Sequence, residues 1–214
     1  MQIQMFDSTP QSLQRMNLEG RSSIELEYSP HVWDENQSSI LLSRLLKEID
    51  WHVDEIRIFG KVRSIPRMTA WYGDSDAIYV YSGIKNVPLP WSPLISEIRQ
   101  AVQRLTGQVF NSVLLNRYRS GTDYMSWHSD DELELGPEPL IASVSFGKTR
   151  TFEFRPKSPS LGKNIKLNLE SGSLLVMRGT TQKNWEHRVA KDKKINPGEE
   201  RVNLTFRQIY PRTK

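Results

Sequence analysis

The second half of the chain is a series of short apolar runs, and this series restricts the possible folds more than any other feature of the sequence. The runs are rich in β-branched and aromatic residues and are separated by turn-forming residues, which is typical of β-strands. From residue 109 onward they read VFNSVLLNRY, LIASVSFG, RTFEFR, NIKLNL, GSLLVM, EHRVA and RVNLTFRQIY. Six or seven strands in succession predict a closed or sandwiched β structure.

Two helices are expected before these strands. Residues 33–51 (WDENQSSILLSRLLKEIDW) place apolar side chains at helical spacing after a polar, acidic start. A second apolar stripe runs from Pro93 to Leu105, and Gly107 follows it as a stop signal. Between the helices, residues 57–83 mix aromatic, basic and turn-forming residues, which fits short strands and exposed loops better than core. The predicted class is therefore mainly β with flanking helices (α+β).

Composition limits the number of domains and the type of metal site. At 214 residues, with 37% hydrophobic and 25% charged residues, the chain is long enough for one domain with a well-buried core. We expect a loose leader over residues 1–20 and a single domain over residues 21–214. Because the chain contains no cysteine, a metal would have to be bound by His, Asp or Glu.

Charge and hydropathy bear on partners and location. The net charge of +4 and the pI of about 9.3 permit a polyanionic partner without requiring one. The first twenty residues lack the basic start and apolar core of a signal peptide, and no run is long enough to cross a membrane. We therefore expect a soluble, intracellular monomer without a membrane partner, cytoplasmic in a bacterium and nuclear in a eukaryote.

The stretch SWHSDDELELG contains a candidate metal site. Residues two apart in a strand point to the same face, so His128 and Asp130 could share a ligand. His31 and His52 lie in or beside the helical N-terminal part, whereas His187 follows a strand-like run that a β-barrel could bring opposite. Two histidines and one carboxylate leave other metal positions open for substrates, as in non-haem Fe(II) oxygenases. Such a pattern also arises by chance, so unrelated surface residues remain the alternative.

The run RVNLTFR alternates strictly between polar and apolar residues. Its polar face carries Arg201, Asn203, Thr205 and Arg207. If this face pointed to solvent, the run would be an ordinary edge strand. If it pointed inward, the two guanidinium groups would need anions, because an unpaired buried charge is costly. Their planar forks suit the two carboxylates of a short dicarboxylic acid, to which Asn116 and Tyr118 could add hydrogen bonds from a shared face.

Four motifs in this order resemble the AlkB-type Fe(II)/2-oxoglutarate dioxygenases that demethylate nucleic-acid bases: NRYRSGTDYMSWHSDDE, ASVSFGKTRTFEFR, GSLLVM and RVNLTFR. The resemblance covers about residues 59–210, which is most of the chain. IFGK, IPR and YVYSG are similar to the members that repair duplex DNA. The resemblance implies a double-stranded β-helix (jelly roll) with helices against one sheet, a nucleotide-recognition lid over residues 57–83 and a jelly-roll core over residues 109–211.

The resemblance also implies the site and its chemistry. It makes His128, Asp130 and His187 the iron ligands. It assigns 2-oxoglutarate to Asn116, Tyr118, Arg201, Asn203, Thr205 and Arg207, with Arg201 and Tyr118 at the distal carboxylate and Arg207 and Asn116 near the end that chelates iron. With Fe(II) bound and O2 as a second co-substrate, 2-oxoglutarate would be decarboxylated to succinate, and an N-methyl group on a base would be hydroxylated and lost as formaldehyde.

The same resemblance assigns further residues to the methylated base. Asp131 and Glu132 would face a flipped base and favour cationic N1-methyladenine or N3-methylcytosine. A solvated acidic turn is the alternative for these two residues. Tyr81 would stack on the base, with Tyr79 and Ser82 lining the pocket, although a tyrosine in a strand is more often plain packing.

Another group of residues would contact duplex DNA. Phe59 and Gly60 occupy the place of a finger that fills the gap left by the flipped base, although a lone phenylalanine is more often a core residue. The phosphate contacts would be Lys61, Arg63 and Arg67, and Arg155 would also reach the substrate strand.

Methylated DNA, duplex or single-stranded, is therefore the expected partner, with RNA as a further candidate. Two other classes of function remain open. An enzyme with the same chemistry on RNA or on a protein side chain would not need the Phe59 wedge. A non-catalytic β-barrel that binds a metal or a small acid would tolerate loss of the triad without losing its partner.

Overall fold

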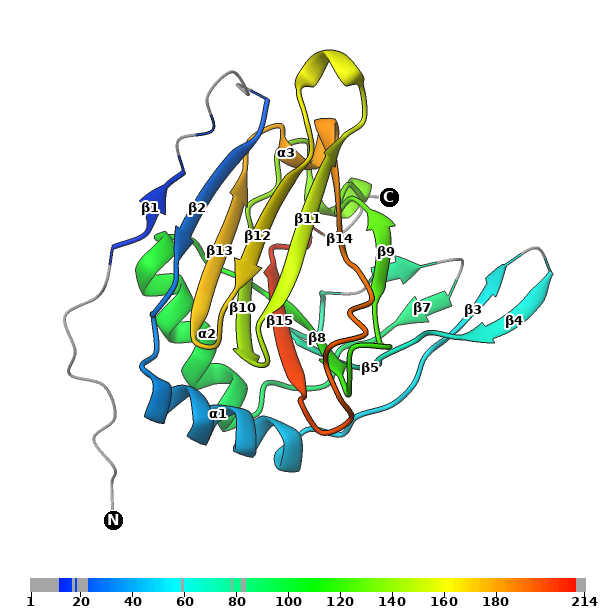
Figure 1. The fold of residues 1–214 in the computed structure, drawn as a ribbon. Helices are drawn as coiled ribbons and strands as arrows, with labels where there is room; N and C mark the ends of the chain where they lie inside the picture. Colours follow the sequence, from blue (N-terminus) through cyan, green and yellow to red (C-terminus); the bar gives the residue numbers. More distant parts are fainter. Residues whose placement is uncertain are drawn as a thin grey trace.

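The computed structural model describes residues 12–16, 18, 23–58, 60–77, 79–81 and 84–210. Two antiparallel sheets lie face to face, and two helices cover the outer face of the larger one (Figure 1). This arrangement confirms the predicted jelly-roll class with flanking helices.

The larger sheet has seven strands in the order β1-β2-β13-β10-β15-β8-β5. Their bounds are β1 (Gln14–Arg15), β2 (Glu25–Ser29), β13 (Ser173–Arg178), β10 (Ile141–Gly147), β15 (Arg201–Arg207), β8 (Ser112–Tyr118) and β5 (Met68–Gly73). The RVNLTFR run is β15, which pairs with β10 on one side and with β8 on the other. It is a central strand, so the edge-strand alternative is excluded.

The smaller sheet has four strands in the order β12-β11-β14-β9. Their bounds are β12 (Ile165–Leu169), β11 (Arg150–Pro156), β14 (Trp185–Val189) and β9 (Met125–His128). Each of the seven predicted runs forms a strand in one of the two sheets, and β9 is an additional strand that the runs did not predict.

Two hydrophobic clusters occupy the two faces of the larger sheet. Successive residues of a strand point to opposite faces, and β13 divides its side chains accordingly. Leu174 and Val176 pack in the cluster beneath the helices. Leu175 and Met177 pack in the cluster between the sheets, together with Trp185 of β14. Apolar side chains from both sheets therefore fill part of the space between them.

Both predicted helices are present. α1 (Glu35–Glu48) is preceded by its N-cap residue Asp34, whose side chain forms a reciprocal capping box with Gln37. α2 (Pro93–Thr106) ends at Gly107, whose φ of 67° lies in the left-handed region that favours glycine. Among the described residues, no helix is long and apolar enough to cross a membrane.

Residues 57–83 do form short strands, as predicted, but one of them belongs to the core. The hairpins β3–β4 (Glu55–Ile58 and Lys61–Ser64) and β6–β7 (Tyr79–Tyr81 and Ile84–Asn86) extend to one side of the sheets (Figure 1). Between them, β5 pairs with β8 in the larger sheet. The expectation that this region avoids the core is wrong for β5, because its alternate residues Ala70 and Tyr72 pack beneath the helices.

The N-terminal part also differs from the expectation of a loose leader. Gln14 and Arg15 form β1, and Met16 continues this pairing by donating its N–H to the carbonyl of Leu26 in β2. The sequence analysis did not predict β2, although its run ELEYS alternates acidic and apolar residues as a half-buried strand does. Its Leu26 is 1% exposed. Residues 1–11, 17 and 19–20 of the predicted leader lie outside the described residues.

Candidate active site

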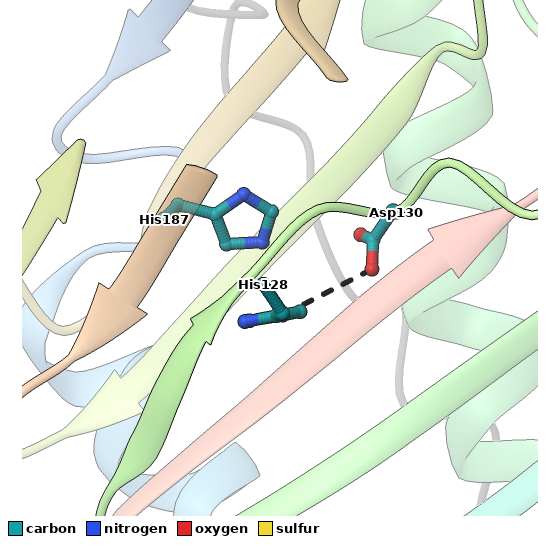
Figure 2. A group of neighbouring side chains, drawn as sticks. All are labelled: His128, Asp130 and His187. Carbon is teal, nitrogen blue, oxygen red and sulfur yellow. Dashed lines mark ion pairs between the residues drawn. The ribbon is translucent and has the colours of Figure 1, made fainter. Parts of the chain in front are cut away.

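Three side chains with metal-binding atoms converge between the two sheets. His128 is the last residue of β9, and His187 lies directly opposite it on β14. One ligand atom from each of His128, Asp130 and His187 lies within 4.8 Å of the others. Figure 2 shows the three side chains turned toward one another, with His128 Nε2 4.0 Å from Asp130 Oδ1. The predicted convergence of these residues is present.

The chain achieves this convergence differently from the sequence argument. β9 ends at His128, so Asp130 lies in the following loop and not on the same face of a strand. The run before His187 is also not one strand, because the short helix α3 (Thr181–Asn184) separates β13 from β14. Strand pairing therefore positions the two histidines, while loop contacts position the carboxylate.

A backbone contact fixes the tautomer of His128. Its Nδ1 lies 2.9 Å from the carbonyl oxygen of Ser126. A carbonyl oxygen can only accept, so Nδ1 carries the proton in this contact. This contact leaves Nε2, which faces Asp130, as the nitrogen that can bind a metal.

Arg207 keeps the Asp130 carboxylate ionised. Arg207 Nη2 donates to Asp130 Oδ1 at 2.8 Å. Burial alone would raise the pKa of Asp130, but the positive charge of the adjacent Arg207 guanidinium outweighs it, and the pKa is lowered to about 2. Asp130 is therefore anionic at neutral pH.

Burial keeps the His187 imidazole neutral. The side chain is buried, and its ring stacks on Phe152 with the centroids 5.2 Å apart. Burial, followed by the nearby His128, lowers the pKa of His187 to about 3. Two imidazoles and one carboxylate form the donor set that suits non-haem Fe(II).

The polar face of β15 points inward, toward the smaller sheet. Tyr118 and Asn116 of β8 lie opposite Arg201 and Asn203 in the register. Asn203 Nδ2 donates to Ser143 Oγ at 2.8 Å, and Thr205 Oγ1 donates to Asn203 Oδ1 at 2.9 Å. These bonds satisfy Asn203, Thr205 and Ser143. The inward polar surface of β15 and β8, which carries Arg201, Asn203, Thr205, Arg207, Asn116 and Tyr118, forms one wall of the site. Ser143 was not predicted, although the alternation of serine with apolar residues in ASVSFG was a signal for it.

Arg201 is a buried cation with unused donors. It is 1% exposed, its Nη2 donates to Ser145 Oγ at 3.0 Å, and its guanidinium lies 5.2 Å from the centre of the Tyr118 ring. Among the described residues, its Nε and Nη1 have no hydrogen-bond partner. Burial lowers the pKa of Arg201 to about 10. A carboxylate would satisfy both donors and the charge.

One cavity joins the triad to this wall. Its lining comes from both sheets and from the Asp130 loop: Leu114, Asn116, Tyr118, Met125, His128, Asp130, Ser143, Phe152, Met177, His187, Val189, Asn203, Thr205 and Arg207. Five of the six residues predicted for the co-substrate are in this lining, and Arg201 packs against one of them, Tyr118. The donor set fits Fe(II), and the two arginines fit the two carboxylates of a dicarboxylic acid.

Comparison with known families decides the class of this site. The sequence profile of the 2OG-Fe(II) oxygenase superfamily matches residues 25–207, which include the triad and both arginines. The chain belongs to this superfamily. Fe(II) and 2-oxoglutarate are therefore the metal and the co-substrate of this oxygenase, with O2 as the other co-substrate.

The AlkB resemblance of this oxygenase is confirmed by curated relatives. The chain is 40% identical over 190 residues to human alpha-ketoglutarate-dependent dioxygenase alkB homolog 3, and the match covers 85% of this chain and 65% of that protein. It is 42% identical over 184 residues to bovine DNA oxidative demethylase ALKBH2 (81% and 65%), and 41% identical over 185 residues to the mouse protein of that name (80% and 76%). The chain thus spans slightly less than two thirds of the first two relatives.

A solved structure supports the fold. The structure of OsALKBH1 matches with a TM-score of 0.60 at 20% identity, covering 86% of this chain and 97% of that one. At this identity the likeness concerns the jelly-roll fold alone.

Arg150 is a buried residue of the oxygenase site that the sequence analysis missed. Its guanidinium lies 5.5 Å from the centre of the Tyr118 ring. It donates to the backbone carbonyls of Ser120, Asp123 and Ala190 at 2.6–3.2 Å. Burial lowers the pKa of Arg150. Nothing in the sequence distinguished this arginine from a surface residue, because its partners are carbonyl groups of distant loops.

The two acids predicted to face the base lie just after the triad carboxylate. Asp131 Oδ2 accepts from Lys157 Nζ at 2.9 Å. Asp131 is therefore ion-paired, which the sequence did not indicate. Glu132 precedes the 3₁₀ turn at Leu133–Leu135 and is half-buried. Their contact with a base stays a prediction.

The residues predicted for DNA fall into two locations. Gly60, Lys61 and Arg63 are exposed on the β3–β4 hairpin. Arg67 instead donates from Nε to Asn116 Oδ1 at 2.7 Å, which places it at the co-substrate wall. Phe59 and Ser82 lie outside the described residues, as do the side chains of Tyr79 and Tyr81.

Arg155 lies on the face of the smaller sheet opposite to the metal site. It is paired with Glu186 across β11 and β14, next to the pair that contains His187. Its Nε donates to Glu186 Oε2 at 2.7 Å, and its guanidinium lies 4.5 Å from the centre of the Trp127 ring. It does not line the cavity, so a contact with the substrate strand would have to occur on the outer surface.

Proposed function

We propose that this oxygenase removes methyl groups from N1-methyladenine and N3-methylcytosine in DNA and so repairs alkylation damage. The observation that carries the proposal is the triad of His128, Asp130 and His187, which shares one cavity with Arg207 and the polar residues of β15 and β8. The names of the ALKBH2 relatives, DNA oxidative demethylase, support DNA as the substrate.

The chain's own residues would prepare the metal site. His128 presents Nε2, His187 presents a neutral imidazole, and Asp130 presents an anionic oxygen that Arg207 keeps ionised. When bound, Fe(II) with 2-oxoglutarate and O2 supplies the oxidation that yields succinate and a hydroxylated methyl group, which leaves as formaldehyde.

The wall of the larger sheet would orient the co-substrate. We assign its distal carboxylate to the two unused donors of Arg201 beside Tyr118. We assign the opposite end to Arg207 and Asn116, because Arg207 already contacts the triad through Asp130. Asn203 and Thr205 hold this wall through their mutual hydrogen bond.

Duplex DNA is the form of substrate that we propose. The exposed β3–β4 hairpin carries Lys61 and Arg63, which suit phosphate groups. We assign Phe59, which directly precedes Gly60 in the sequence, as the wedge. We further propose that the enzyme acts as a monomer.

Formaldehyde release from N1-methyladenine in defined oligonucleotides tests this function. Release should require both Fe(II) and 2-oxoglutarate. Parallel reactions on methylated duplex DNA, single-stranded DNA and RNA separate the proposed substrate from its alternatives. Release from RNA alone would reject DNA as the substrate. No release from any oligonucleotide, with 2-oxoglutarate still consumed on a methylated peptide, would favour a protein substrate.

A further inference from the structure

The loop that carries Asp130 holds a candidate metal ligand without the support of strand pairing. The two histidine ligands are held opposite each other by the pairing of β9 and β14. Asp130 lies beyond the end of β9 and has no such pairing. Arg207 of β15 holds its carboxylate, and side chains that tie the loop to the segment of α3 and β14 set the position of its backbone relative to His187.

Gln182 provides the most direct of these ties. It lies in α3, five residues before His187, and is 1% exposed. Its Oε1 accepts the backbone N–H of Asp130 at 2.9 Å. Its Nε2 donates to Met177 Sδ at 3.3 Å. Both ends of the amide are thus engaged, and the amide cannot rotate without breaking both contacts.

Two further contacts join the same two segments. Ser129 Oγ donates to the carbonyl oxygen of Trp185 at 3.0 Å. Lys157 Nζ binds both Asp131 Oδ2 at 2.9 Å and the carbonyl oxygen of Gln182 at 3.0 Å. The residues on both sides of Asp130 are therefore linked to the α3–β14 segment.

We propose that Gln182, assisted by Ser129, is a positioning residue for the metal centre. By holding the backbone of Asp130 on the segment that carries His187, it sets the distance between the carboxylate and the second imidazole before a metal arrives. The proposal rests on the metal site alone and not on the identity of the methylated substrate. Residues that orient metal ligands in this way typically contribute about 10- to 100-fold to metal affinity.

Mn(II) binding to the full chain tests this role without depending on catalysis. Gln182→Met keeps the length and neutrality of the side chain but removes the acceptor of the Asp130 N–H. We expect the Kd for Mn(II), measured by calorimetry, to rise about 10- to 100-fold. The visible spectrum of the Co(II)-loaded variant should also change, because the carboxylate ligand is displaced. Ser129→Ala should raise the Kd by a smaller factor.

Gln103→Met is the matched control. Gln103 lies in α2, on the other side of the larger sheet, and its Oε1 accepts the backbone N–H of Phe110 at 3.0 Å. The substitution removes the same kind of bond, so it should lower the melting temperature without changing Mn(II) affinity. An equal loss of affinity in both glutamine variants, or an unchanged Kd in Gln182→Met, would overturn the proposal. If Gln182→Met does not fold, an unchanged Kd in Ser129→Ala overturns it instead.

Discussion

Polar side chains at the cavity between the sheets are buried and fixed by neighbouring strands, whereas those on the β3–β4 hairpin are exposed to solvent. Arg201, which packs against Tyr118 of the cavity lining, is 1% exposed, and the register of three adjacent strands determines its neighbours. Lys61 and Arg63 on the hairpin are exposed on a strand that pairs with one other strand only within the described sheets. A fixed wall suits chemistry that is common to all substrates, whereas an exposed hairpin suits recognition that differs between substrates.

This contrast has a measurable consequence. Substitutions in the cavity should reduce activity on every substrate by the same factor. Substitutions on the hairpin should change the ratio of activities between substrates. The outer face of the smaller sheet, where Arg155 lies, belongs to neither region. Substitutions there should change activity least.

The largest effect is expected for Asp130→Ala. The variant lacks the anionic ligand and also leaves Arg207 without the carboxylate that it contacts at 2.8 Å. Formaldehyde release should fall below detection on duplex, single-stranded and RNA substrates alike, and Mn(II) binding should weaken. Loss of one partner of a buried ion pair costs about 3–5 kcal/mol, so a lower melting temperature should accompany a retained far-UV spectrum. Substantial release from any one substrate would contradict the triad assignment.

Arg201→Met should separate stability from function. Replacing a buried, incompletely satisfied cation by an apolar side chain is often neutral or stabilising, by about 1–4 kcal/mol. We therefore expect the melting temperature without co-substrate to be maintained or raised. Loss of a buried charge contact should increase the KM for 2-oxoglutarate about 100-fold or more, on all substrates equally. A fall in stability together with an unchanged KM would place Arg201 in the structural core and not at the co-substrate.

Periodicity placed the polar residues of β15 on one face, but it left open whether that face points inward, and the family resemblance assigned them to the co-substrate. Arg201, Asn203 and Thr205 alternate with apolar residues, and one face of a central strand must point inward. Their companions from β8, Asn116 and Tyr118, follow the same rule. The register of β8 against β15 then brings both sets together, although the sequence alone could not give that register.

The loop that carries Asp130, its contacts and strand β5 could not be predicted from periodicity. Asp130 was identified through an argument about strand alternation that its loop does not satisfy, so the correct residue was chosen for the wrong reason. The ties through Gln182 and Lys157 connect residues 26 to 52 positions apart, and neither residue belongs to a periodic pattern. β5 was assigned outside the core because its mixed composition hides the buried face that contains Ala70.

Phe59→Ala should change the preference between substrates. Extruding a base from paired DNA costs a few kcal/mol, and a wedge offsets part of this cost only when a duplex is present. Repair of methylated duplex DNA should fall about 10-fold more than repair of the same base in a single strand, which corresponds to about 1.4 kcal/mol. The KM for 2-oxoglutarate should stay unchanged.

A core phenylalanine at position 59 would behave differently. Its truncation would lower stability by about 3–5 kcal/mol and reduce activity on both substrates together. Equal losses on the two substrates, with a lower melting temperature, would reject the wedge. Lys61→Ala, two positions further along the chain, is the matched control, because it removes the proposed phosphate contact without removing the aromatic ring and should cause a smaller duplex-specific loss.

The smallest effect is expected for Arg155→Ala. Its ion pair with Glu186 is partly exposed, and such pairs contribute about 0–1 kcal/mol to stability. The Trp127 ring would retain the guanidinium of Arg188, which lies 4.4 Å from its centre. Melting temperature and activity on single strands should therefore hardly change. If Arg155 binds a phosphate of the substrate strand, the slope of log affinity against log salt for a methylated duplex should become shallower by about one unit.

Arg188→Ala removes a cation from the same Trp127 ring and serves as the control. A similar change of slope in both variants would show a general effect of surface charge and would remove Arg155 from the set of substrate residues.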